Sequence, residues 1–147
     1  MVPFTTANPD IDETPLENES PIQLVERLAI EKAQEIAKTH PDSLIIGSDQ
    51  VAMHGTKIVG KPHTHERAIQ QLREASGKKI DLFTGLAVIN SSTGNIQSDV
   101  VPFSVHFKTL SDYVIERYLR KEEPYNCAGS VKSEGLGVAL FERFNGE

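Results

Sequence analysis

The stretch Leu44–Gln50, LIIGSDQ, places three large apolar residues directly before a glycine, a hydroxyl, a carboxylate and an amide. The apolar run is short, which predicts a buried strand over residues 44–47. Ligands of open α/β sheets bind beyond the carboxyl ends of the strands. We therefore expect Asp49 to follow this strand at the mouth of a ligand site, the alternative being an ordinary strand-ending turn.

A helix is predicted immediately before this strand, from Ser20 to about Thr39. Ser20 is the expected N-cap, Pro21 occupies the first helical position and Gln23 completes a capping box. The apolar stripe of this helix consists of Val25, Leu28, Ala29, Ala33 and Ile36. Lys32 falls inside that stripe, so its ammonium must reach solvent, an ion-pair partner or a ligand.

The rest of the chain alternates between helical and strand patterns. Two further helices are expected, one that starts at Thr64 or a neighbour and ends at Ser76-Gly77, and one that Ser111 caps and that ends before Pro124. Strands are expected over residues 2–7, 80–89, 96–107 and 138–141, followed by a hairpin turn at Asn145-Gly146. Intermixed helices and strands predict an α/β fold built on a mixed β-sheet flanked by helices.

Composition narrows the class of protein. The chain has 147 residues, enough for one domain with a core, and a formal net charge of −6 without clustered Lys and Arg. The single Cys127 cannot form an intramolecular disulfide, and no apolar run approaches the roughly 20 residues of a membrane helix. We expect a cytoplasmic protein that binds a small ligand and has neither a nucleic-acid nor a membrane partner.

Carboxylates and lysines are the candidate chemical groups. Asp10, Asp12 and Glu13 lie in a proline-framed acidic loop. Together with Asp49, such carboxylates can hold a divalent cation or activate a water, although a solvated acidic loop is the alternative. Lys32 and Lys61 are candidate cations for an anionic substrate, the alternative being surface lysines whose ammonium groups reach solvent.

Three other patterns carry less weight. The glycine-rich stretch at 127–137 would let backbone N–H groups approach a ligand, but such stretches are usually turns. His63 and His65 lack a third metal ligand at a recognisable spacing, so a helix N-terminus explains them better. Cys127 has no evident base beside it and is expected to be a small buried thiol.

Six segments, distributed over nearly the whole chain, form a pattern in order and spacing. They are PDIDETP (9–15), RLAIEKA (27–33), IIGSDQV (45–51), GKP (60–62), TGLAV (84–88) and AGSVKSEGLG (128–137). This pattern resembles the Maf family of nucleotide pyrophosphatases. The resemblance implies an elongated α/β fold related to the inosine-triphosphate pyrophosphatases. It also implies hydrolysis of a nucleoside triphosphate to monophosphate and pyrophosphate, with a divalent cation, Mg²⁺ or Mn²⁺, as cofactor.

The resemblance implies roles for individual residues as well. Asp49 matches the carboxylate that activates water, and Glu13, Lys32 and Lys61 match the other catalytic positions. Glu13 and Asp49 would bind the metal, and the two lysines would bind phosphates. The implied substrate-binding positions are Ser48, Gln50, Ser130 and Glu134.

The segment Ser130–Gly135 indicates a branch of the family. It is similar to the 7-methyl-GTP pyrophosphatases, whereas the branch that acts on dTTP and UTP has glutamine in place of Glu134. A carboxylate there could accept hydrogen bonds from the N1–H and N2–H₂ edge of guanine and favour the positive charge of the methylated ring. Alternatives are a dTTP or UTP pyrophosphatase and a non-catalytic nucleotide-binding module of the septum-formation-inhibitor type.

Two parts of the family pattern have no counterpart in this sequence. The opening strand with its Ser-x-x-Arg segment and the closing strand and helix are absent. We therefore expect a single Maf-like domain over residues 1–147 that is truncated at both ends. Loss of the first strand would expose sheet edges, which favours either association, with a homodimer as one expected form, or instability.

Overall fold

The computed structural model describes residues 1–132 and 134–146. The chain forms two compact units. The first unit combines Met1–Asp49 with Thr84–Val101, and the second combines Gln50–Phe83 with Pro102–Glu147. The chain passes from the first unit to the second between Asp49 and Gln50, inside the stretch that opened the sequence analysis.

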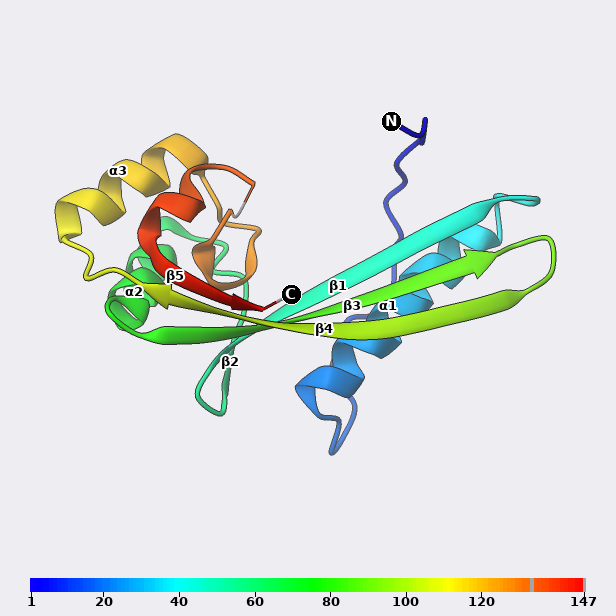
Figure 1. The fold of residues 1–147 in the computed structure, drawn as a ribbon, viewed down its shortest axis with the longest axis horizontal. Coiled ribbons are helices and arrows are strands. Elements are labelled where there is room, and N and C mark those ends of the chain that lie inside the picture. Colours follow the sequence, from blue (N-terminus) through cyan, green and yellow to red (C-terminus); the bar gives the residue numbers. More distant parts are fainter. Residues whose placement is uncertain (133, 147) are drawn as a thin grey trace. The chain divides into compact units, whose positions relative to one another are not determined.

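The described strands form one five-stranded sheet in the order β2-β1-β3-β4-β5 (Figure 1). Their bounds are Leu44–His54 for β1, Lys57–Val59 for β2, Lys79–Asn90 for β3, Asn95–Phe107 for β4 and Phe141–Gly146 for β5. The α/β class is confirmed, but the sheet is antiparallel, so the prediction of a mixed sheet was wrong. Short turns join β1 to β2 and β3 to β4, and only antiparallel neighbours can be joined by so few residues.

The first unit packs one helix, α1 (Pro21–Ala37), against one face of its strands (Figure 1). The predicted capping box at Ser20 and Gln23 is present. The buried core of this unit consists of Ala29, Ala33, Ile45, Ala87 and Ile89. Two strand glycines allow the helix to approach closely, because a Cβ would overlap a helix carbonyl at each: that of Ala29 at Gly47 and that of Val25 at Gly85.

The second unit contains two helices, α2 (His65–Ala75) and α3 (Asp112–Glu122), with the predicted N-caps at Thr64 and Ser111. Two short 3₁₀ turns follow, η1 (Ala128–Ser130) and η2 (Leu136–Leu140). The core of this unit includes the fully buried side chains of Leu72, Val105, Ile115 and Leu119.

One predicted strand is absent, and another was wrong in its limits. Residues 2–7 form no strand, and Val2 and Phe4 are 81% and 78% exposed. A strand requires a neighbour to complete its hydrogen-bond ladder, and no described strand pairs with this segment. β1 continues to His54 instead of ending at Gly47, because Ala52 to His54 pair with β2. Asp49 therefore lies within a strand and not beyond its end.

The end of the chain differs from the prediction as well. Residues 136–140 form η2, and the strand begins at Phe141 and includes Asn145-Gly146, which we predicted as a turn. Asn145 pairs with Ser104, and Gly146 pairs with Phe103. A Cβ at Gly146 would overlap the ring of Phe103, so the glycine serves close packing here and not a turn.

Candidate functional site

Lys32 of α1 lies between two carboxylates in the first unit. Its Nζ is 2.7 Å from Oε1 of Glu13 and 2.8 Å from Oδ1 of Asp49. The side chains of Lys32 and Asp49 are mostly buried, whereas that of Glu13 is about half exposed. The structure thus brings together three of the four residues predicted to be catalytic, from the acidic loop, α1 and β1.

The alternation of strand side chains explains how Asp49 reaches Lys32. Ile45, Gly47 and Asp49 share one face of β1, and Ile45 belongs to the core formed with α1. Gly47 lets the helix come close to the strand at this point. Lys32 lies on the stripe of α1 that packs against this face of β1. Its ammonium can therefore reach the carboxylate of Asp49.

Electrostatics keep Lys32 charged. Burial lowers the pKa of its ammonium, but hydrogen bonds and charge attraction from Asp49 and Glu13 act in the opposite direction and prevail, so the pKa is raised. An ammonium flanked by two carboxylates leaves a local charge of about −1 when both carboxylates are ionised. The cluster can therefore hold an additional cation or accept a proton.

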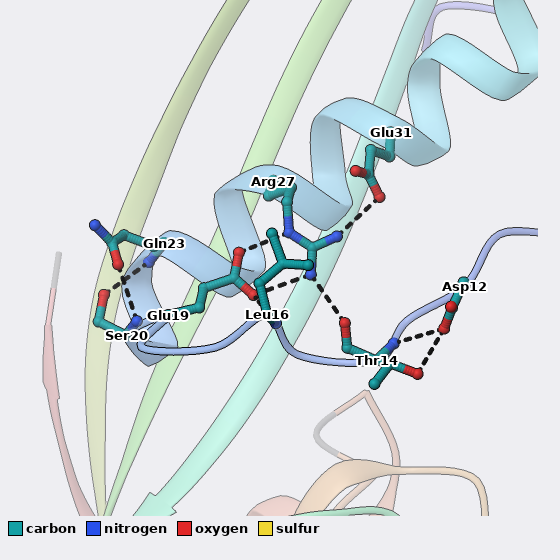
Figure 2. A network of polar contacts seen from close by, with 8 residues as sticks. All are labelled: Asp12, Thr14, Leu16, Glu19, Ser20, Gln23, Arg27 and Glu31. Atoms are coloured by element: carbon teal, nitrogen blue, oxygen red, sulfur yellow. Dashed lines mark hydrogen bonds and ion pairs between the residues drawn. The ribbon is translucent and has the colours of Figure 1, made fainter.

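A second ionic network holds the acidic loop on the same helix (Figure 2). The Arg27 guanidinium donates to both carboxylate oxygens of Glu19, with Nε 2.6 Å and Nη2 2.9 Å from them. It also donates to Glu31 at 3.0 Å and to the backbone carbonyl of Thr14 at 3.2 Å. Because Thr14 is the neighbour of Glu13, Arg27 fixes the loop next to the carboxylate that meets Lys32.

Hydrogen bonds within this network lower two carboxyl pKa values. Hydrogen bonds from the side chain and backbone of Thr14 lower the pKa of Asp12, and the Arg27 guanidinium lowers the pKa of Glu19. In return the pKa of Arg27 is raised. We missed this network in the sequence, where the available signal was the i, i+4 spacing of Arg27 and Glu31.

A cleft of about 780 Å³ lies in the first unit, within the range of small-molecule sites. Its lining includes Lys32 and Ser48 but neither Glu13 nor Asp49, so Lys32 is the one member of the ion-pair cluster that contributes to this cleft. Ser48 lies on the face of β1 opposite to Asp49. The remaining lining residues come from the N-terminal segment, the end of α1 and the start of β1: residues 3–7, Pro9, Ile36, His40 and 43–47.

The donor set fits a hard divalent cation in part. Glu13 and Asp49 supply carboxylate oxygens, the ligands that Mg²⁺ and Mn²⁺ prefer. Among residues 1–132 and 134–146, no group of three or more His, Cys, Asp or Glu side chains could hold a metal. A cation here would accordingly take its other ligands from water and from a substrate, as Mg²⁺ does at phosphate sites.

The other predicted site residues belong to the second unit. Gln50 begins it, Lys61 is exposed in the loop before α2, and Glu134 is exposed between η1 and η2. Ser130 is fully buried, and its hydroxyl donates to Oε1 of Gln71 at 2.6 Å. The Ser130 side chain thus contacts the protein interior and supports the loop on which Glu134 lies.

Two weaker candidates have structural explanations. His65 contacts Tyr125 through Nδ1 (2.7 Å) and Glu116 through Nε2 (2.9 Å), and Thr64 caps the helix as predicted. Burial, followed by the nearby Glu134 carboxylate, raises the pKa of the Cys127 thiol, which opposes a role as nucleophile. In the part of the chain that the structure describes, no helix is long and apolar enough to cross a membrane.

Comparison with known proteins gives consistent matches. The family described as Maf-like protein matches residues 1–147. A 7-methyl-GTP pyrophosphatase of Pseudomonas fluorescens strain Pf0-1 is 55% identical over 145 residues, which cover 99% of this chain and 76% of that protein. Proteins of the same name are 57% identical in P. fluorescens strain Pf-5 (96% of this chain, 73% of the relative) and 54% identical in P. putida strain KT2440 (99% and 76%). The match over the whole length and the identity of these relatives show that the chain belongs to the Maf-like family.

Proposed function

We propose that this protein is a nucleotide pyrophosphatase that hydrolyses 7-methyl-GTP to 7-methyl-GMP and pyrophosphate. One observation carries the proposal: Lys32 Nζ lies 2.7 and 2.8 Å from the carboxylates of Glu13 and Asp49. Lys32 also contributes to the lining of a cleft in the size range of small-molecule sites. Its relatives, which share 54–57% of their aligned residues with it, are named 7-methyl-GTP pyrophosphatases, and this supports the same reaction.

Asp49 is the general base in this proposal. Its carboxylate takes a proton from a water, and the water oxygen bonds to the α-phosphorus. The bond between the α-phosphorus and the oxygen that bridges to the β-phosphate then breaks, and its electron pair leaves with pyrophosphate. Lys32 orients Asp49 through their 2.8 Å contact and offsets negative charge on the phosphates, as Lys61 would from its exposed loop.

Glu13 and Asp49 would hold a divalent cation, Mg²⁺ or Mn²⁺. When bound, such a cation offsets charge on the phosphate oxygens. The acidic loop is suited to this role because Arg27 and Thr14 hold the backbone beside Glu13.

Glu134 is the residue proposed to recognise the nucleotide base, and we call it the base reader. As a carboxylate it accepts hydrogen bonds from N1–H and N2–H₂ of guanine, and its charge favours the ring made cationic by methylation at N7. The equivalent edge of thymine or uracil presents a single N–H, so such a base would gain less. Gln50 and Ser48 are proposed as further substrate contacts.

Hydrolysis of 7-methyl-GTP, dTTP and UTP by the full chain, followed by release of pyrophosphate, tests this function. Asp49→Asn should lower kcat by about a thousandfold, since a positioned general base contributes roughly 10²–10⁴. Asp10→Asn, in the exposed part of the acidic loop, is the matched control and should retain activity. An Asp49→Asn variant as active as the parent would refute the mechanism, and a parent inactive on all three nucleotides would refute the function.

Glu134→Gln tests the base-reading role separately. The variant should lose about tenfold or more of its preference for 7-methyl-GTP over dTTP, because a charged acceptor is replaced by a neutral amide. An unchanged preference would remove Glu134 from the proposal but leave the pyrophosphatase reaction intact.

A further inference from the structure

Gln71 of α2 uses both ends of its side-chain amide to bind two separate loops. Its Nε2 donates to the carbonyl of Gly60 at 2.9 Å, and its Oε1 accepts from the Ser130 hydroxyl at 2.6 Å. Gly60 directly precedes Lys61, and Ser130 lies four residues before Glu134. A single side chain therefore connects the loop of a proposed phosphate-binding residue with the loop of the proposed base reader.

A backbone contact reinforces this connection. The N–H of Gly129 donates to the same Gly60 carbonyl at 3.2 Å, so that carbonyl receives two hydrogen bonds. Gly129 and Ser130 both have positive φ, 67° and 61°. This conformation suits glycine but is unfavourable for serine, and it persists where surrounding contacts impose it.

Every polar atom of Ser130 forms a hydrogen bond. Its hydroxyl donates to Gln71, its N–H donates to the carbonyl of Cys127 at 3.1 Å, and its carbonyl accepts from the Tyr118 hydroxyl at 3.0 Å. The Tyr118 hydroxyl also accepts from the N–H of Lys132 at 2.9 Å. Glu134 is thus an exposed carboxylate that follows two residues with well-defined contacts, Ser130 and Lys132.

The chemistry of the contact requires an amide. Gln71 must donate to a carbonyl at one end and accept from a hydroxyl at the other, and a glutamine amide has both functions. A glutamate at this position would accept from Ser130 but could only repel the Gly60 carbonyl. A methionine would have similar length and neither function.

We propose that Gln71 is a positioning residue that sets the base selectivity of the enzyme by holding the Glu134 loop against the Lys61 loop. This inference rests on the proposed function, because selectivity presupposes that Glu134 reads the base. Gln71 acts through the two loops and not by touching the nucleotide. Its loss should thus alter the preference between nucleotides more than it alters the folded structure.

The test compares Gln71→Met and Gln71→Glu with Gln70→Met, a matched control on the same helix. Gln70 is exposed and donates only to Glu74 of its own helix among the contacts described. The readout is the ratio of kcat/KM for 7-methyl-GTP to that for dTTP, with thermal unfolding as a check of folding. We expect Gln71→Met to reduce this ratio about tenfold, Gln71→Glu to reduce it less, and Gln70→Met to leave it unchanged.

A double variant separates positioning from general stability. In a Glu134→Gln background, Gln71→Met should cause no further loss of the ratio, because the residue through which it acts has been removed. A ratio unchanged in Gln71→Met, or equal losses for both nucleotides, would overturn the inference while the pyrophosphatase function stands. If the parent hydrolyses neither nucleotide, the proposed function fails. The role of Gln71 can then be tested by calorimetry, as the ratio of the binding affinities for the two nucleotides. A parent that binds neither nucleotide selectively would overturn the inference too.

Discussion

Two loops of this protein are each held by hydrogen bonds to helix side chains, but the hydrogen bonds are of different kinds. In the first unit, Arg27 of α1 holds the acidic loop through charged hydrogen bonds to Glu19 and to a backbone carbonyl, and it also pairs with Glu31 of its own helix. In the second unit, Gln71 of α2 and Tyr118 of α3 hold the loop around Ser130 through neutral hydrogen bonds.

The two kinds of hydrogen bond respond differently to pH, to salt and to the loss of a partner. Charged hydrogen bonds are strong and directional, but they depend on protonation and, where exposed, on salt. Neutral hydrogen bonds to buried groups are insensitive to salt, and their loss leaves a buried donor or acceptor without a partner. The loop that would bind a cation is therefore held mainly by ionic contacts, whereas the loop that would discriminate a base is held at Ser130 by neutral ones. The Glu122 carboxylate adds charged contacts further along this second loop, to Lys132 and to the N–H of Leu136.

The largest effect is expected from breaking the ionic support. Arg27→Met should lower kcat/KM for 7-methyl-GTP and dTTP alike, by about a hundredfold, because small displacements of a catalytic group cost roughly this much. Arg27→Lys should recover part of the activity, since a lysine keeps the charge but cannot form the two-pronged contact with Glu19. Steady-state kinetics measure both variants.

The control for this change is Arg73→Met, which removes an exposed pair with Asp112 and should have little effect on activity. A loss confined to one nucleotide after Arg27→Met would contradict the comparison, because the acidic loop is assigned to the phosphate chemistry common to both.

A smaller effect is expected from breaking the neutral support. Tyr118→Phe leaves the carbonyl of Ser130 and the N–H of Lys132 without their shared partner, which should reduce the free energy of unfolding by about 1–3 kcal/mol. Tyr113→Phe on the same helix is the control, because its hydroxyl is exposed and accepts only from Arg117 among the described contacts. Chemical denaturation measures both, and equal stabilities would contradict the assigned role.

The smallest and most informative effect concerns pH, because the two loops should weaken at opposite ends of the scale. The pKa values of Asp12 and Glu19 are lowered in the folded protein, so their stabilisation is present above the ordinary carboxyl range near pH 4 and is lost as the pH falls through the lowered values. Burial raises the pKa of Tyr118 to about 12, so its contribution is present below about pH 10 and is lost as the pH rises towards 12.

Amide protection measured by hydrogen exchange follows both loops. The N–H of Thr14 should lose protection in acid, after correction for the intrinsic exchange rates. The N–H of Ser130 should lose protection in alkali, because an ionised Tyr118 can no longer donate to the carbonyl of Ser130. High salt should reduce the protection of Thr14 more than that of Ser130. Parallel loss at both sites under any one condition would show that the two loops do not respond independently.

Much of the fold was predictable because its signals are local. Each of the caps at Ser20, Thr64 and Ser111 accepts a hydrogen bond from a backbone N–H three residues later, and such contacts depend on no other part of the chain. The hairpin of β3 and β4 followed from alternating side chains on either side of a turn that contains Gly94 with a φ of 78°. Lys32 stood out because a charge on an apolar stripe requires a partner.

The hydrogen-bond partners of these side chains could not be predicted from the local sequence. Nothing near Arg27 in the sequence indicates that its guanidinium reaches Thr14, thirteen residues away, and nothing near Gln71 indicates Ser130, fifty-nine residues away. The segment at 2–7 has strand-like residues, but a strand exists only with a neighbour. Asn145-Gly146 has the sequence of a turn but lies in a strand, where the ring of Phe103 occupies the space beside Gly146.

The stretch LIIGSDQ likewise has some features that the local sequence determines and others that depend on tertiary contacts. By itself the sequence determined that a strand leads up to Asp49 and that Lys32 must find a partner, because hydrophobic periodicity and the cost of burying a charge act locally. The expected burial of this strand was wrong for Leu44 and Ile46, which are 73% and 71% exposed because they lie on the face of β1 opposite to α1. The tertiary structure alone decided that the strand continues past Asp49 and that Lys32 meets both Asp49 and Glu13. The physical reason is that pairing with β2 and the close approach of α1 to Gly47 involve residues distant in the sequence, and such contacts exist only once the chain has folded.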